Sequence, residues 1–144
     1  MSEKFDELLI FPTPSSVGER PWGSEDLLAL VSEKFSVKKL FLRSGSKGGL
    51  QYHRLKDEVA VLLSGRMIIR YDLGDGVLKE KIISAGEVAH FPPGLVHQEE
   101  ALDDCLIIEA STPHFNDRVR MEESYGLGSP SGLPTTDESQ IEIR

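Results

Sequence analysis

The chain has 144 residues, with 24 Asp and Glu against 16 Lys and Arg, and a formal net charge of −8. This length fits one domain that folds without disulfides or a structural metal. The negative charge disfavours nucleic acid and anionic lipid as partners, and the apolar runs fall far short of the ~20 residues of a membrane helix. With one cysteine and no signal-peptide pattern, we expect a cytoplasmic protein.

Short stretches that alternate or are β-branched follow one another along the chain, separated by turn residues. In chain order, we expect strands at 35–43, 58–63, 66–71, 77–83, 87–91 and 105–110. The loop DLGDG at 72–76 has the Asp-Gly chemistry of a hairpin. Helix is expected at only two places, over 2–10 and over 24–30.

This pattern predicts an all-β fold, an antiparallel sandwich or barrel with short N-terminal helical segments. We expect a single domain over 1–126 with its core at about 34–112. Gly, Ser, Pro and Thr then become frequent, which predicts a flexible tail over 127–144. The alternation within 140–143 leaves a second interpretation, in which these residues add an edge strand to a partner.

Two of the four histidines lie in spacings that are unusual for a β protein. One segment reads Gln51-x-His53-x4-Glu58, and the other reaches His97 soon after a Pro-Pro-Gly bend. Residues two apart in a strand share a face, so Gln51 and His53 point the same way. Glu58 begins the antiparallel partner strand, and His97 arrives from a neighbouring one. We therefore expect these four side chains to face one volume inside a barrel.

Such a set combines two neutral imidazoles, one carboxylate and one amide oxygen. It suits one divalent transition metal, Zn²⁺, Fe²⁺, Mn²⁺ or Ni²⁺, with positions left for water or substrate. Gln51 either coordinates through its amide oxygen or hydrogen-bonds a metal-bound water. Cys105 lies mid-strand and is expected to be a buried apolar residue rather than a ligand.

These spacings resemble the paired motifs of the cupin superfamily, G-x5-H-x-H-x3,4-E-x6-G and G-x5-P-x-G-x2-H-x3-N. Gln51 replaces the first His and Ala101 replaces the final Asn. The resemblance implies a double-stranded β-helix, or jelly roll. A Gln, His, Glu, His set also resembles the ligands of zinc-dependent type I phosphomannose isomerases, so zinc is the first expectation, with Fe, Mn and Ni as alternatives.

Other segments are similar to the C-terminal cupin domain of type II phosphomannose isomerase/GDP-mannose pyrophosphorylases. The matching pieces are GERPWGSED at 18–26, FPPGLVH at 91–97 and DRVRMEESYG at 117–126. This resemblance implies aldose–ketose isomerisation of a sugar phosphate. The chain departs from that family where Arg54 and Leu55 replace consecutive histidines and Lys56 replaces an arginine.

Five further side chains are expected to act on the substrate. The candidates are His90 and Lys56 as catalytic groups, and Tyr52, Arg54 and Arg120 as substrate-binding residues. Histidine exchanges protons near neutral pH, and a cation holds a phosphate. His90 has two alternatives, a packing role and a place at a dimer interface, and the cations at 54 and 56 have the alternative of a solvated turn.

Three functions follow, all with a small-molecule ligand. The first is a metal-dependent isomerase or epimerase of a small sugar or sugar phosphate, similar to mannose-6-phosphate isomerase. The alternatives are a metal-dependent cupin dioxygenase or polyketide-cyclase-like enzyme, for which two histidines and a carboxylate are typical iron ligands, and a non-catalytic small-molecule-binding cupin. Because a jelly roll exposes sheet edges, we expect a homodimer.

Overall fold

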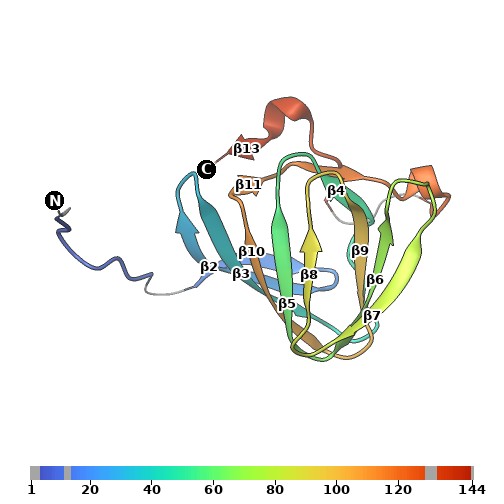
Figure 1. Ribbon diagram of the computed structural model, residues 1–144, viewed down its shortest axis with the longest axis horizontal. Helices are drawn as coiled ribbons and strands as arrows, with labels where there is room; N and C mark the ends of the chain where they lie inside the picture. The colour runs from blue at the N-terminus through green and yellow to red at the C-terminus, as the bar shows by residue number, and fades with distance from the viewer. Residues whose placement is uncertain (1–3, 12–13, 129–132, 144) are drawn as a thin grey trace.

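The computed structural model describes residues 4–11, 14–128 and 133–143, which form two antiparallel sheets and a short extra strand pair (Figure 1). In spatial order, the larger sheet contains Ser15–Arg20 (β1), Gly23–Val31 (β2), Phe35–Leu42 (β3), Cys105–Ser111 (β10), Glu58–Ser64 (β5) and Val88–Phe91 (β8). The second contains Arg118–Arg120 (β12), Gln51–His53 (β4), Val96–Ala101 (β9), Arg66–Asp72 (β6) and Lys79–Ser84 (β7). The extra pair is His114–Phe115 (β11) with Glu142–Ile143 (β13). The expected all-β jelly roll is confirmed.

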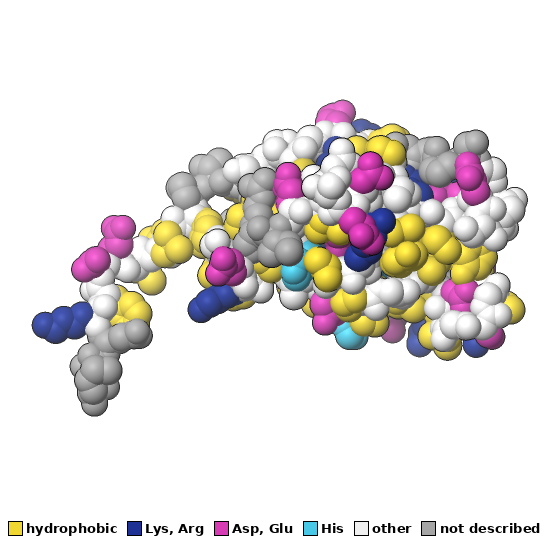
Figure 2. All heavy atoms as spheres, turned by 90° about the horizontal axis from the view of Figure 1, so that it is seen from above, with side chains coloured by type: hydrophobic (Ala, Val, Ile, Leu, Met, Phe, Trp, Pro, Cys, Tyr) yellow, Lys and Arg dark blue, Asp and Glu magenta, His cyan; other side chains and the backbone are white. Residues whose placement is uncertain are grey.

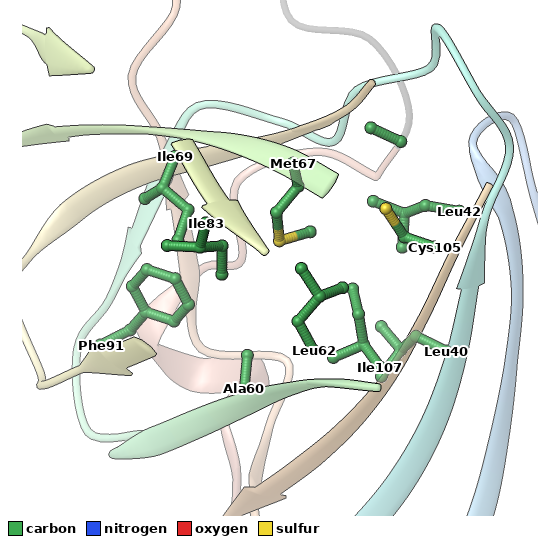
Figure 3. Packing of buried hydrophobic residues seen from close by; sticks show 11 residues of the cluster. Leu40, Leu42, Ala60, Leu62, Met67, Ile69, Ile83, Phe91, Cys105 and Ile107 are labelled. Atoms are coloured by element: carbon green, nitrogen blue, oxygen red, sulfur yellow. The ribbon is translucent and has the colours of Figure 1, made fainter. Parts of the chain in front are cut away.

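Strand alternation gives each sheet an inward face, and the apolar part of that face forms the core (Figure 3). The core residues are Leu40, Leu42, Ala60, Leu62, Met67, Ile69, Ile83, Phe91, Ala101, Cys105 and Ile107. Two strands change from apolar to polar along this same face. Ala60 and Leu62 follow Glu58 in β5, and Ile107 precedes Glu109 in β10. The apolar core therefore fills one part of the barrel and leaves the other part to polar side chains.

The expected helix over 24–30 is wrong. These residues lie in β2, which pairs with β1 on one side and β3 on the other, with Leu27 opposite both Ser15 and Lys38. Leucines at 27, 28 and 30 suggest a helical face, but the two-sided hydrogen-bonded pairing outweighs that local pattern. The other expected helix is also not found. Residues 4–10 have no regular structure, and 2–3 lie outside the described residues.

The N-terminal segment reaches away from the barrel, with apolar side chains exposed (Figure 2). Phe5 and Leu8 are 81% and 82% exposed.

The C-terminal segment, for which the sequence predicts flexibility, lies against the barrel over 133–143. The Thr136 backbone N–H donates to the Arg118 carbonyl at 2.9 Å, and Thr136 is buried. Strand β13 pairs with β11 of the same chain. Residues 129–132 and 144 of the expected tail lie outside the described part. Short 3-10 turns occur at Glu123–Tyr125 (η1) and Glu138–Gln140 (η2), and no helix in the described residues is long and apolar enough to cross a membrane.

Candidate metal centre

A cavity of about 640 Å³ occupies the polar part of the barrel. Side chains from both sheets line it, and the C-terminal segment contributes Leu133 and Glu142. The floor combines two histidines and several carboxylates with the core residues Leu40 and Leu42. A small polar molecule in this cavity would therefore contact both chemically reactive groups and apolar side chains.

His53, Glu58 and His97 converge in this cavity as a compact group of ligand atoms. Glu58 Oε1 lies 3.9 Å from His53 Nε2 and 3.6 Å from His97 Nε2. One ligand atom from each of the three residues lies within 4.8 Å of the other two, and all three residues are buried. Two imidazoles and a carboxylate at this spacing can hold a divalent transition metal and leave coordination positions open.

Strand register explains how residues distant in sequence meet here. Gln51 of β4 is the direct partner of His97 in β9, and on the other side of β4, Arg120 of β12 is the partner of Gln51. Opposed residues share a face of the sheet, so Gln51 points into the cavity beside His97. The structure thus brings together all four residues that the sequence proposes as ligands, with Gln51 as a neighbour of the three-residue cluster.

Hydrogen bonds on the far side of each imidazole hold the two rings in ligand orientation. His53 Nδ1 donates to Asp117 Oδ1 at 2.8 Å, and His97 Nδ1 donates to the Leu95 carbonyl at 2.9 Å. With the proton on Nδ1, the Nε2 lone pair of each ring faces Glu58. The His97 ring also stacks on Phe91, with centroids 4.1 Å apart. Such outer contacts are typical of metal-binding histidines, so the donor set fits a metal.

Burial and neighbouring charges set the protonation of these groups. Burial lowers the pKa of His53 despite the Asp117 hydrogen bond, which favours the neutral ligand form. Burial opposes charge on His97, but contact with Glu58 outweighs it and raises the pKa of His97. The Lys56 ammonium and the two histidines hold the pKa of Glu58 well below its usual range, against the effect of burial.

Asp117 has a buried carboxylate that also accepts two backbone N–H bonds, from Leu55 at 2.9 Å and Lys56 at 2.8 Å. Burial alone would raise the pKa of Asp117, but the hydrogen bond from His53 and those from the backbone lower it to about 2. Sequence reasoning gave no role to Asp117. Because 64 residues separate Asp117 from His53, no local pattern connects the two. The only sequence feature that pointed to Asp117 was its place at the start of the DRVRMEESYG segment.

Lys56 is already engaged with two carboxylates. Its Nζ lies 2.8 Å from Glu58 Oε2 and 2.7 Å from Glu109 Oε1, and all three side chains are largely buried. Burial opposes its charge, but Glu109 and Glu58 outweigh that effect and raise the pKa of Lys56. Lys56 therefore stays protonated and holds the Glu58 oxygen that points away from His53 and His97, rather than standing free as a proton-transfer group.

Two carboxyl groups that the sequence reasoning missed line the cavity. Glu99 follows His97 by two residues on the same face of β9, and Glu109 follows Ile107 by two on β10. Burial raises the pKa of each to about 7. Alternation carried a signal for both, because each acid is in phase with a residue that faces the barrel interior.

The remaining predicted site residues separate into two groups. Arg120 lines the cavity and pairs with Glu122. Tyr52 and Arg54 are not among the residues lining the cavity, and the Arg54 guanidinium donates instead to the Thr136 carbonyl.

His90 points away from the cavity. Its side chain is 59% exposed, and its Nε2 lies 2.7 Å from Asp57 Oδ1. The adjacent Phe91 is in the core, so alternation along β8 turns His90 outward. This placement removes the basis for a catalytic role.

Comparison with known proteins gives sequence relatives that are much longer than this chain. No protein-family model matches. Over 111 residues, 74% of the chain, it is 30% identical to mannose-1-phosphate guanylyltransferase 2 of Escherichia coli O157:H7. Over 112 residues, also 74%, it is 27% identical to the xanthan biosynthesis protein XanB of Xanthomonas campestris pv. campestris strain B100. The chain spans only 22% and 23% of those two proteins.

Solved structures show the same fold at lower identity. Capsular polysaccharide assembling protein CapF from Staphylococcus aureus superposes with a TM-score of 0.62 and 22% identity, over 69% of this chain and 28% of that one. An oxalate decarboxylase from B. subtilis superposes with a TM-score of 0.68 and 15% identity, over 99% of this chain and 43% of that one. An RmlC-like cupin from Shewanella frigidimarina superposes with a TM-score of 0.55 and 19% identity, over 69% of this chain and 81% of that one.

Proposed function

We propose that this chain, which has the cupin fold and a His-Glu-His cluster able to hold a metal, isomerises or epimerises a small sugar or sugar phosphate in a metal-dependent reaction. The observation that carries the proposal is the convergence of His53 Nε2, Glu58 Oε1 and His97 Nε2 inside the cavity, with both Nδ1 atoms bound elsewhere. Similarity to proteins named for mannose 1-phosphate, xanthan and capsular polysaccharide supports a sugar ligand.

The three cluster residues would hold the metal, and Gln51 is placed to act as a fourth ligand or to bind a water on it. A divalent metal at this position supplies Lewis acidity toward a carbonyl or hydroxyl oxygen of the sugar. Lys56 keeps the second oxygen of Glu58 occupied, which favours coordination through Oε1 alone.

Proton transfer falls to Glu99 in this proposal. Its carboxyl lines the cavity on the same strand face as His97, and among the described residues it forms no ion pair. A carboxylate at this position can accept a proton from one carbon of the sugar and return it to the next. Glu109 is less suitable because it is held by Lys56.

The same cluster supports a second candidate, an iron-dependent oxygenase. Two histidines and one carboxylate with open positions are the usual ligands of non-haem Fe²⁺ in oxygenases. The identity of the bound metal separates the candidates. The cytoplasmic location and the homodimer stay predictions from the sequence.

Elemental analysis of untagged protein tests the centre. We expect about one equivalent of a first-row metal in the wild type and loss of it in His97→Ala and Glu58→Ala. His90→Ala is the matched control, since it removes an exposed histidine, and should keep the metal. If the bound metal is Zn, Mn or Ni, isomerisation of mannose 6-phosphate and related sugars is assayed next. In that assay, Glu99→Gln should abolish turnover while the metal stays bound. Iron would favour the oxygenase, and failure to take up any metal would overturn both.

A further inference from the structure

Cationic side chains line the cavity at six positions, and four of them already have carboxylate partners. Lys56 lies between two carboxylates, and Arg120 pairs with a glutamate. Arg20 and Lys38 share Glu25, at 3.4 and 3.3 Å. Within the described part of the chain, only the remaining two, Lys47 and Arg118, line the cavity without a carboxylate oxygen within 4.0 Å.

Arg118 is the half-buried member of this pair, whereas Lys47 is exposed. Its guanidinium contacts only neutral oxygens, Thr136 Oγ1 and Asn116 Oδ1 at 3.3 Å and the Pro134 carbonyl at 3.5 Å. Burial and then the charge of Arg20 lower the pKa of Arg118, so the environment disfavours its charge. A guanidinium nevertheless stays charged in proteins, and Asp117 and Glu25 favour that charge without lying within 4.0 Å of it. An anion in direct contact with Arg118 would supply the charged hydrogen-bond partner that its neutral acceptors do not.

The register places this cation beside the metal ligands. Arg118 of β12 is the direct partner of His53 in β4, and both line the cavity. Direct partners have Cα atoms about 5 Å apart and side chains on the same face. A single small molecule can therefore contact both the His53–Glu58–His97 cluster and the Arg118 guanidinium.

We propose that Arg118 binds the anionic group, a phosphate or a carboxylate, of the molecule whose oxygen atoms approach the metal cluster. This inference rests on the proposed function for the position of the sugar, and it names the substrate class as anionic sugars. The planar fork of a guanidinium matches two oxygens of either anion. Of the cations that the sequence analysis proposes, Lys56 and Arg120 are neutralised by their own carboxylates, and Arg54 does not line the cavity.

Calorimetric binding of matched sugar pairs tests the assignment. Mannose 6-phosphate against mannose probes a phosphate, and glucuronate against glucose probes a carboxylate, each with and without added Zn²⁺. In the wild type we expect the anionic member of at least one pair to bind about tenfold or more tightly, as for one charge-assisted contact. Arg118→Gln should remove this advantage, and Arg118→Lys should retain part of it.

Two control variants separate loss of the cation from loosening of the C-terminal segment. Thr136→Val removes an acceptor of Arg118 but leaves the guanidinium in place. Arg54→Gln removes a positive charge and a contact to the same segment, outside the cavity. Both should keep the anionic preference. Thermal unfolding confirms that each variant is folded.

The preference for anionic sugars and the proposed isomerisation are tested independently of each other. If no pair shows an anionic preference, or if the preference persists in Arg118→Gln, the assignment of Arg118 is overturned even when the protein isomerises sugars. If the preference depends on Arg118 but NMR of the titrated samples shows no isomer or epimer, the anion site stands and the proposed reaction fails.

Discussion

Replacing Asp117 with Asn would reverse the proton position on a candidate metal ligand. Two backbone N–H groups, from Leu55 and Lys56, donate to Asp117 Oδ2, so the one oxygen of an Asn side chain must stay there. Its NH₂ group then faces His53 Nδ1 and donates to it. The neutral His53 ring carries its proton on Nε2 instead, which is the atom that faces Glu58 and would bind the metal.

Substituting an outer hydrogen-bond partner of a metal-binding histidine weakens metal affinity by about 10- to 100-fold, or about 1.4–2.8 kcal/mol. The hydrogen bonds of Asp117 also stabilise its carboxylate form, and they lower its pKa from 3.8 to about 2 despite burial. Because the pKa is lowered, this stabilisation is present above about pH 4 and disappears as the pH falls toward 2.

Competition with a coloured zinc chelator at pH 7 measures the loss directly. Asp57→Asn is the matched control, since it removes the same charge from another Asp–His pair, the exposed one with His90. We expect Asp57→Asn to bind zinc as the wild type does and Asp117→Asn to bind it at least tenfold more weakly. Wild-type affinity in a folded Asp117→Asn protein would refute the claim that Asp117 sets the His53 proton.

Three further predictions concern stability, each measured by urea unfolding. Lys56→Met leaves two buried carboxylates without their cation and should lower the free energy of unfolding by about 3–5 kcal/mol, with part of the loss recovered on adding Zn²⁺. Leu62→Ala, in the core, should lower it by about 2–5 kcal/mol, whereas Leu63→Ala, half exposed on the same strand, should change it by less than about 0.5 kcal/mol. Gly65→Ala places a Cβ 2.4 Å from the Asp104 carbonyl oxygen, at a φ of +85°. Gly74→Ala meets no atom within 4 Å and should lower the free energy of unfolding by only about 1–3 kcal/mol, through its φ of +116°. Gly65→Ala should therefore destabilise the protein more than Gly74→Ala. Equal effects within either matched pair would contradict the packing on which it rests.

The fold and the core of the site were predictable because their signals are local. Turn residues and alternation placed β3, β5, β6, β7, β8 and β10 within two residues of where they lie, but gave no bounds for β4 and β9. Alternation within β4 gives Gln51 and His53 their common direction. The expectation that Glu58 begins the antiparallel partner of that strand is wrong, because β5 pairs with β10 and β8, and Glu58 reaches the same cavity from the other sheet. His97 arrives from β9, which neighbours β4 as the sequence predicts.

Long-range pairing accounts for what was missed. Residues 24–30 look helical in isolation and become a strand because β1 and β3 flank them. Asp117 reaches His53 only through the pairing of β12 with β4, which no local pattern reveals. His90 was assigned to the cavity, but Phe91 occupies the inward phase of β8 and leaves His90 outside.

The polar part of the barrel is costly for stability, which is itself an argument for a ligand there. Glu58, Asp117 and Glu109 are largely buried acids, and Lys56 is the ammonium placed between two of them. Replacing buried ion pairs with apolar residues is often neutral or stabilising, so packing alone does not favour this arrangement. The core that continues the same strands shows that this barrel accommodates leucine and isoleucine at neighbouring inward positions. A divalent cation near Glu58 would offset the excess of negative charge, and an anion beside Arg118 would give its guanidinium a charged partner. Glu58 and Arg118 line the same cavity, and Arg118 is the direct strand partner of His53, as expected if one bound molecule, through the metal and its own anionic group, compensates both.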